Sequence, residues 1–257
     1  MGEPSFVDVR REGAVAVLTL RRDEKLNAIS PHVERDLGDA IAGDEVRGSG
    51  AVVLTGAGRA FSAGADVDEL SGLTPKDVVE YYRTTGEVYE RVAALPQPTF
   101  AAIHGYCLGG GLELALAADF RIADGTAIFG LPEVELGILP SSGGTHRLVR
   151  LVGPGRAKEL ILLRSRFTAE EALGFGVVTE LVADGEALPR TLEFAATVAE
   201  LPRLAASVAK QAANLLPESS REAGILLERL AYAALAQTEE VRQAESAWAE
   251  RRATGQR

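Results

Sequence analysis

One acidic side chain stands alone in a long apolar stretch of the chain. From Val92 to Ala118 the sequence reads VAALPQPTFAAIHGYCLGGGLELALAA, in which Glu113 is the single carboxylate. Burying a carboxylate among apolar side chains is costly, and burial raises its pKa toward the range in which it exchanges protons at neutral pH. Alternatively, Glu113 lies solvated in the first turn of a helix, where the helix dipole favours an acid. The residues alone leave both interpretations open.

Two glycine-rich loops each follow a predicted strand. Gly109, Gly110 and Gly111 precede a predicted helix, and GAGRAFSAGAD occupies residues 56–66 after the apolar run at 51–55. Glycine permits a ligand to approach the backbone closely, and the first N–H groups of a helix have no partner within that helix. One N–H from each loop could converge on one oxygen and form an oxyanion hole. A lone glycine-rich loop is otherwise a tight turn.

A second pair of acids follows, in the segment FGLPEVELGILP at residues 129–140. In this segment Glu133 and Glu135 stand two residues apart, and one of them could face inward while the other faces solvent. An inward glutamate is commonly a capped or paired structural residue. Spacing along the chain does not place either acid beside Glu113.

Other motifs that carry chemistry are incomplete. Gly56 and Gly58 would begin a dinucleotide-binding fingerprint, but Phe61 occupies its third glycine position. Pro140 stands where a nucleophile elbow around Ser142 needs its first glycine. The histidines lack metal-ligand spacing and Cys107 is the single cysteine, so the sequence predicts neither a metal site nor a disulfide.

Composition favours a globular chain without nucleic-acid or membrane partners. The 257 residues are 46% apolar and carry 37 acidic against 27 basic side chains, a net charge of −10. This charge argues against a nucleic-acid partner. We find no apolar run of the ~18–20 residues that a membrane span needs and no signal peptide, so we expect a cytoplasmic protein.

The predicted elements alternate between strand and helix. Apolar, β-rich runs occur at residues 14–20, 51–55, 99–103 and 177–182, and the first three lack polar alternation, as expected for strands covered on both faces. Ser30 and Thr74 each precede a proline, a pattern typical of a helix N-terminus, and predict helices to about Ala42 and Ala94. A short apolar helix is predicted at 112–118. The fold class is therefore α/β.

After about residue 185 no strand signal remains. Two or three helices fit the rest of the chain, and residues 221–252 carry apolar positions at helical spacing, a stripe that packs on the chain's own core or on another subunit. We therefore predict an α/β core over residues 1–190 and a helical region over residues 191–257.

Three segments together resemble the enoyl-CoA hydratase/isomerase (crotonase) family. They are GRAFSAGADVDEL at 58–70, HGYCLGGGLELA at 104–115 and FGLPEVELGILPSSGGTHRL at 129–148. The resemblance extends from about Val15 to about Val182. It implies a spiral of ββα units, a helical C-terminal trimerisation region, assembly as a homotrimer or a dimer of trimers, an acyl-CoA thioester substrate, and no metal or redox cofactor.

The resemblance also implies roles for individual residues. The N–H groups of Ala65 and Gly110 would form the oxyanion hole, and Glu113 and Glu133 would be the catalytic pair that hydratases of the family carry. Glu135 would be an ordinary structural residue. Substrate and CoA contacts are expected from Lys25, Leu26, Ala63, Ala65, Asp66, Val67, Asp68 and Gly110, with Arg22 and Arg59 as further candidates for the phosphates.

The sequence departs from the pattern of many members just beyond Glu133. Ser141 and Ser142 replace Gly-Ala, and His146 replaces Gln, which could alter the hydrogen bonding of Glu133. The helix predicted after Thr74 carries three tyrosines that we expect to line the acyl pocket: Tyr81, Tyr82 and Tyr89.

Two retained glutamates favour hydration of a trans-2-enoyl-CoA to a 3-hydroxyacyl-CoA, with Glu113 as the base and Glu133 handling the proton at the α carbon. One alternative is an enoyl-CoA isomerase or a specialised dehydratase on the same scaffold; isomerases typically need one acid. Another is an acyl-CoA-binding protein without turnover.

Overall fold

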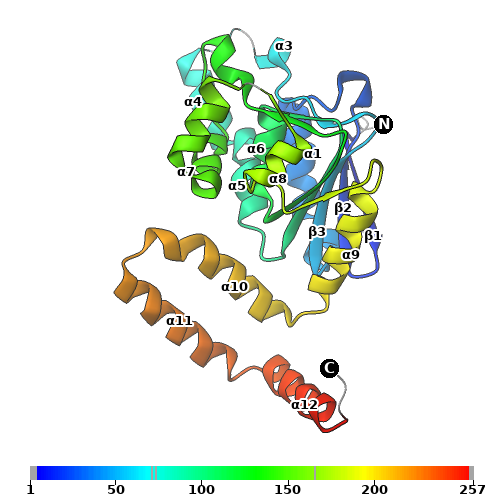
Figure 1. Ribbon diagram of the computed structural model, residues 1–257, viewed down its shortest axis with the longest axis vertical. Helices are drawn as coiled ribbons and strands as arrows, with labels where there is room; N and C mark the ends of the chain where they lie inside the picture. The colour runs from blue at the N-terminus through cyan, green and yellow to red at the C-terminus, as the bar shows by residue number, and fades with distance from the viewer. Residues whose placement is uncertain (1–4, 71, 73, 165, 255–257) are drawn as a thin grey trace.

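The computed structural model of the chain describes residues 5–70, 72, 74–164 and 166–254. It has an α/β body and a helical arm that extends away from the body toward the C-terminus (Figure 1). Two β-sheets organise the body.

The larger sheet has the strand order β1-β2-β3-β5-β7-β10. Strands β1 and β2 are antiparallel, and every other neighbouring pair in this sheet is parallel. Its strands are β1 (Val7–Glu12), β2 (Val15–Leu20), β3 (Ala51–Gly56), β5 (Thr99–Ile103), β7 (Phe120–Asp124) and β10 (Glu180–Val182).

The smaller sheet has the order β4-β6-β8-β9, with β4, β6 and β8 parallel and β9 antiparallel to β8. Its strands are β4 (Ala60–Ser62), β6 (Tyr106–Leu108), β8 (Ile128–Gly130) and β9 (Phe167–Thr168). Each successive pair along the chain, β3 and β4, then β5 and β6, then β7 and β8, gives its first strand to the large sheet and its second to the small one. This repetition confirms the predicted spiral of ββα units.

The central strands are buried on both faces, as their unbroken apolar sequences predict. In β3, Val52 and Leu54 belong to the larger core cluster, whereas Ala51 and Val53 face the opposite side. That opposite side is covered by α9 (Ala187–Ala199), whose Ala195 is buried there. Successive residues of a strand point to opposite faces, so both faces must be apolar.

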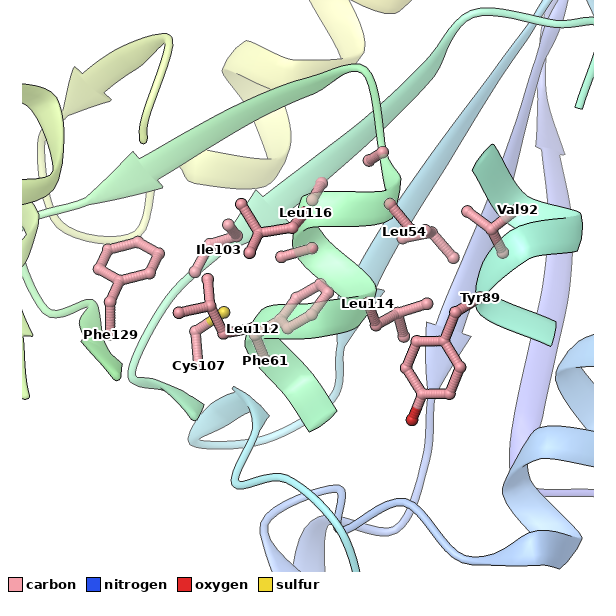
Figure 2. Packing of buried hydrophobic residues seen from close by; sticks show 14 of the residues in the cluster. Leu54, Phe61, Tyr89, Val92, Ile103, Cys107, Leu112, Leu114, Leu116 and Phe129 are labelled. Carbon is pink, nitrogen blue, oxygen red and sulfur yellow. The ribbon is translucent and has the colours of Figure 1, made fainter. Parts of the chain in front are cut away.

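Helix α6 (Gly110–Ala117) lies at the centre of the larger cluster, and all eight of its residues are buried. Figure 2 shows Leu112, Leu114 and Leu116 of this helix among apolar side chains from β5, β6, β4 and α5 (Val88–Ala93). A helix that is apolar on every side is a core helix. Its burial is what places Glu113 inside the body.

The predicted helix starts are confirmed. The Ser30 hydroxyl accepts from the N–H of Val33 at 3.3 Å at the start of α1 (Pro31–Ala42). Thr74 forms a capping box with Asp77 at the start of α4 (Pro75–Arg83). The remaining body helices are α2 (Asp44–Arg47), α3 (Val67–Leu70), α7 (Gly144–Leu162) and α8 (Ala169–Gly174).

The single helix predicted from Thr74 to Ala94 is wrong. The chain leaves the helical conformation at Thr84 (φ −123°, ψ −97°), makes one 3₁₀ turn over Thr85–Glu87, and continues as α5. The Thr84 hydroxyl donates to the carbonyl of Glu80 at 2.8 Å, a local bond that competes with the helical ladder. Gly86 then packs against the Tyr81 and Tyr82 rings, where a Cβ would lie 2.9 Å from Tyr82 Cδ1.

The C-terminal part contains more helices than the two or three predicted, because α9 is followed by α10 (Arg203–Leu215), α11 (Arg221–Leu235) and α12 (Glu239–Thr254). The predicted division at residue 190 lies inside α9 and stays a prediction about folding units. Lys210 of α10 bonds to Asp119 of the body at 2.9 Å. Beyond it the apolar stripe of α11 does not reach the chain's own core, since Leu226 and Leu230 are 57% and 60% exposed.

Two absences hold within the described ranges. None of the helices there combines the length and apolar character needed to cross a membrane. No group of three or more His, Cys, Asp or Glu side chains in the same ranges is arranged to hold a metal ion.

The packing of α6 predicts the cost of truncating it. Leu112→Ala removes a fully buried side chain, and we expect the free energy of unfolding to fall by about 2–5 kcal/mol. Leu163→Ala is the matched control, because Leu163 is 81% exposed and its loss changes stability by about 0.5 kcal/mol or less. Urea unfolding of both variants measures the difference; equal losses would contradict the core position of α6.

Candidate active site

The Glu113 carboxylate is held by a loop that is distant in sequence. Its Oε1 accepts from the backbone N–H groups of Ser142 at 2.8 Å and Gly144 at 2.9 Å. Glu113 is only 4% exposed, which decides in favour of burial over the solvated helix turn. A Cβ on Gly144 would lie 2.6 Å from Glu113 Cγ, so this contact needs glycine at position 144.

Burial and hydrogen bonding act in opposite directions on Glu113. Desolvation raises the pKa of its carboxyl above the ordinary value, while the N–H groups of Gly144 and Ser142 and the Arg147 guanidinium oppose that rise. The net pKa is raised. A buried carboxylate can stay charged here because hydrogen-bond donors replace part of its hydration.

Glu133 lies beside it on a different element. The segment is not extended but forms a short 3₁₀ helix, Pro132–Leu136, in which Glu133 is half-buried and Glu135 is exposed. Burial raises the pKa of Glu133 to about 7, and the negative charge of Glu113 adds to that rise. Within the described part of the chain, Glu133 Oε2 is buried and has no hydrogen-bond partner. The two predicted acids are therefore close enough for the charge of Glu113 to act on the Glu133 carboxyl.

The two predicted oxyanion-hole amides are neighbours. A Cβ on Gly110 would lie 3.5 Å from the Ala65 nitrogen, and a Cβ on Gly64 would lie 3.4 Å from the Gly110 nitrogen. Gly64 has φ +100°, and its Cβ would lie 2.8 Å from the Leu108 carbonyl oxygen. Gly110 is the first residue of α6, so its N–H has no acceptor within the helix. Ala65 as a residue is exposed.

The loop around Ala65 is fixed by residues before α1. Ile29 donates to the carbonyl of Gly64 at 2.7 Å, and Ala63 donates to the carbonyl of Leu26 at 2.9 Å. Asn27 holds the same region through its side chain, which donates to the carbonyl of Ala60 at 2.7 Å. These bonds bring the predicted contact residues Leu26, Ala63 and Ala65 together.

Two of the basic residues expected to contact the CoA phosphates form ion pairs within the chain. Asp66 is buried and receives Lys25 Nζ at 2.9 Å and Arg22 Nη1 at 2.8 Å. The Lys25 bond and the nearby guanidinium lower the pKa of Asp66 below its ordinary value. Arg22 is itself buried, so its guanidinium is directed to Asp66 and away from solvent.

The other predicted contacts lie at the surface. Val67 and Asp68 begin α3 directly after Asp66 and are exposed. Arg59 is also exposed, in the turn between β3 and β4. Lys25 keeps 45% of its side chain accessible. Lys25 bonds to Asp66, and Val67 and Asp68 follow it, so these three residues lie next to the loop that carries the Ala65 amide.

The three tyrosines gather near the acids from two elements. Tyr81 donates to the buried carboxylate of Glu34, and Tyr82 bonds to Ser141. Tyr89 is buried, and a Cβ on Gly110 would lie 3.2 Å from its hydroxyl oxygen. Burial raises the pKa of all three phenols, and the Glu113 charge contributes to each rise.

Sequence reasoning missed two residues that contact this site. Glu34 lies on the buried face of α1, together with the apolar residues Val33 and Leu37. Its helical spacing from these residues is the signal that could have placed it there. Arg147 carries no role in the sequence analysis above, yet its side chain is only 15% exposed and it donates to the carbonyl of Ser142 at 2.8 Å. Only the tertiary structure identifies its partner.

The fold and this arrangement of groups match one protein class. The family model for enoyl-CoA hydratase/isomerase matches residues 10–256, and the chain belongs to that family.

Individual relatives agree in length and in structure. The chain is 36% identical over 253 residues to the short-chain-enoyl-CoA hydratase of Clostridium acetobutylicum, covering 97% of both chains. It is 34% identical over 246 residues to the crotonyl-CoA hydratase of Syntrophomonas wolfei, covering 95% of both. The crystal structure of an enoyl-CoA hydratase from Bacillus anthracis superposes with a TM-score of 0.90 at 35% identity, covering 96% of this chain and 97% of that one.

The coupling between the two acids predicts a measurable titration. The ¹³C-labelled carboxyl of Glu133 should titrate with a midpoint of about 7. In Glu113→Gln the midpoint should fall, because the neighbouring negative charge is removed. Glu135→Gln is the control and should leave the Glu133 midpoint unchanged. An NMR titration in which Glu113→Gln has no effect would contradict the proximity of the two carboxyls.

Proposed function

We propose that this chain is an enoyl-CoA hydratase that adds water, in the syn sense, across the double bond of a trans-2-enoyl-CoA to give a 3-hydroxyacyl-CoA. The observation that carries the proposal is a buried carboxyl, Glu113, whose charge acts on the half-buried carboxyl of Glu133, near two adjacent backbone amides. The full-length likeness to relatives named as hydratases supports the same reaction.

The amides of Ala65 and Gly110 are proposed to bind the thioester carbonyl oxygen. Negative charge develops on this oxygen as water adds at the β carbon, because the electrons move into an enolate. Fixed N–H donors stabilise such a charge by about 3–4 kcal/mol each. The exposure of Ala65, the proximity of its nitrogen to Gly110 and the position of Gly110 at the start of α6 support this role.

The two glutamates are proposed to bind and activate the water. Glu113 accepts two backbone N–H groups, which favour its charged form and suit a base. Glu133, with a pKa of about 7, carries a proton in a large fraction of molecules near neutral pH and suits delivery of a proton to the α carbon. Because the carboxyls interact, the titration belongs to the pair.

The substrate contacts proposed here, and the cellular location of the protein, are those predicted from the sequence. Lys25, with Val67 and Asp68 around the same loop, is proposed to contact the CoA portion, and the tyrosines of α4 and α5 are proposed to line the acyl side. No metal or redox cofactor is part of the proposed reaction. A cytoplasmic location stays a prediction.

Replacing either acid tests the proposal. Glu113→Gln and Glu133→Gln should each lower kcat for crotonyl-CoA hydration by at least ~10²-fold, the scale of general acid–base catalysis. Glu135→Gln, at the exposed acid two residues from Glu133, should keep the wild-type rate. Hydration is followed by loss of the enoyl thioester absorbance.

Three results would overturn the assignment. Full activity in either glutamine variant would remove the acid pair from the mechanism. Conversion of a 3-enoyl-CoA to the 2-enoyl product without hydration would favour an isomerase. Tight acyl-CoA binding with no product from a panel of enoyl-CoA chain lengths would favour a binding protein.

We further propose that the arm assembles with other copies of the chain as a trimer or a dimer of trimers. The exposed leucines of α11 support this, since such an apolar stripe is covered in a stable protein. Light scattering should give three or six times the chain mass of 27.1 kDa. Leu226→Asp with Leu230→Asp should lower that mass, while Arg229→Gln on the same helix should not. A monomeric wild type would contradict the proposal.

A further inference from the structure

The loop of residues 141–144 supplies both backbone donors to Glu113. Ser142 and Gly144 lie two residues apart, and their N–H groups meet on the same carboxylate oxygen at 2.8 and 2.9 Å. Two donors can converge on one atom only if the loop keeps a fixed shape. The position of the Glu113 carboxylate therefore depends on what holds this loop.

One guanidinium joins the loop to a second helix. Arg147 Nη1 donates to the carbonyl of Ser142 at 2.8 Å, and Nη2 donates to Glu90 Oε1 on α5 at 2.7 Å. The planar fork of arginine suits two simultaneous acceptors in fixed directions. Arg147 is 15% exposed, whereas Glu90 is 66% exposed.

The backbone of the loop is shaped to admit this guanidinium. Gly143 has φ +89°, and a Cβ there would lie 2.2 Å from Arg147 Nη1. Glycine is thus required both by the backbone conformation and by the space that the side chain of Arg147 occupies. At the other end of the loop, the Ser141 hydroxyl bonds to Tyr82 of α4. The loop is tied at both ends to helices that carry the tyrosine cluster.

We infer that Arg147 is a positioning residue for the proposed hydration: it joins the 141–144 loop to α5 and so holds two N–H groups on the Glu113 carboxylate. The inference rests on the proposed function of Glu113 as the base. Arg147 acts through the loop, and its positive charge also acts on Glu113 directly.

Several charged or titratable groups near Glu113 influence the pKa of its carboxyl. The Arg147 charge lowers the pKa of Glu113, so its removal should raise that pKa. The neighbours from the surrounding elements are Glu133 of the 3₁₀ helix, Tyr81 and Tyr82 of α4, Tyr89 and Glu90 of α5, and Arg147 of α7.

Two variants of Arg147 and one matched control separate position from charge. Arg147→Met keeps much of the side-chain length but loses the charge and both hydrogen bonds. Arg147→Lys keeps the charge but offers one ammonium in place of the fork. Arg150→Met, one helical turn later, is the control, because Arg150 likewise bonds to a carboxylate (Glu218, 2.7 Å) and a carbonyl (Asn214, 2.9 Å), both outside the site.

For Arg147→Met we expect kcat to fall roughly 10- to 100-fold with little change in KM, the scale of a small misplacement of a catalytic group. The acidic limb of the plot of kcat/KM against pH should move to higher pH, because a base with a raised pKa loses its proton at a higher pH. For Arg147→Lys we expect kcat roughly tenfold lower with the limb near its wild-type position. Arg150→Met should match the wild type in kcat and in the limb.

A wild-type kcat and an unshifted acidic limb of the kcat/KM profile in Arg147→Met would overturn the inference. A fall in kcat and a shift of that limb in Arg150→Met, equal to those in Arg147→Met, would also overturn it. If Arg147→Met does not fold, Arg147→Lys decides: a tenfold lower kcat at unchanged KM supports the inference, and a wild-type kcat overturns it.

A ¹³C titration of the Glu113 carboxyl gives a second reading that needs no turnover. Its midpoint should rise in Arg147→Met and stay unchanged in Arg150→Met, and an unchanged midpoint in both would overturn the inference. If the wild type hydrates no enoyl-CoA, the proposed function fails, and this titration still decides whether Arg147 acts on Glu113.

Discussion

Backbone segments around the start of α6 approach one another more closely than any side chain would permit. A Cβ on Gly111 would lie 2.5 Å from the Ser62 carbonyl oxygen, and one on Gly64 would lie 2.8 Å from that of Leu108. This contact places the amide of Ala65 next to that of Gly110. Gly144 makes a third close approach, directly onto the Glu113 side chain. The geometry of the site follows from these approaches, since a larger side chain at any of them would separate the groups.

The same packing gives the two carboxyls different environments. Glu113 is more deeply buried than Glu133, but the N–H groups of Ser142 and Gly144 and the charge of Arg147 favour its ionised form. Within the described residues Glu133 Oε2 has no hydrogen-bond partner, and burial together with the Glu113 charge raises the pKa of Glu133 to about 7. When their environments give two carboxyls different pKa values, one can act as the base and the other as the acid. A site that adds a hydroxyl and a proton to one double bond needs both roles.

The sequence predicted much of the fold because its signals are local. The structure confirms the uninterrupted apolar strands, the Ser30 cap and the glycine-rich loops. Each of these features is determined by residues close together in the sequence. The break at Thr84 was missed because it depends on a hydroxyl bond and on packing against the tyrosines. Arg147 was missed for a related reason, as its partner Glu90 is 57 residues away in the chain. The convergence of Glu113 and Glu133 was supplied by family resemblance, because spacing does not encode it.

The proposed hydration requires one thioester carbonyl to meet both amides while the α and β carbons lie between both acids. A crystal structure of the protein with a saturated acyl-CoA such as butyryl-CoA tests this directly, since that compound has no double bond to hydrate. We expect the carbonyl oxygen at ~2.7–3.1 Å from the nitrogens of Ala65 and Gly110, with the α and β carbons between Glu113 and Glu133. A bound thioester whose carbonyl contacts neither amide, or whose β carbon lies away from both carboxyls, would contradict it.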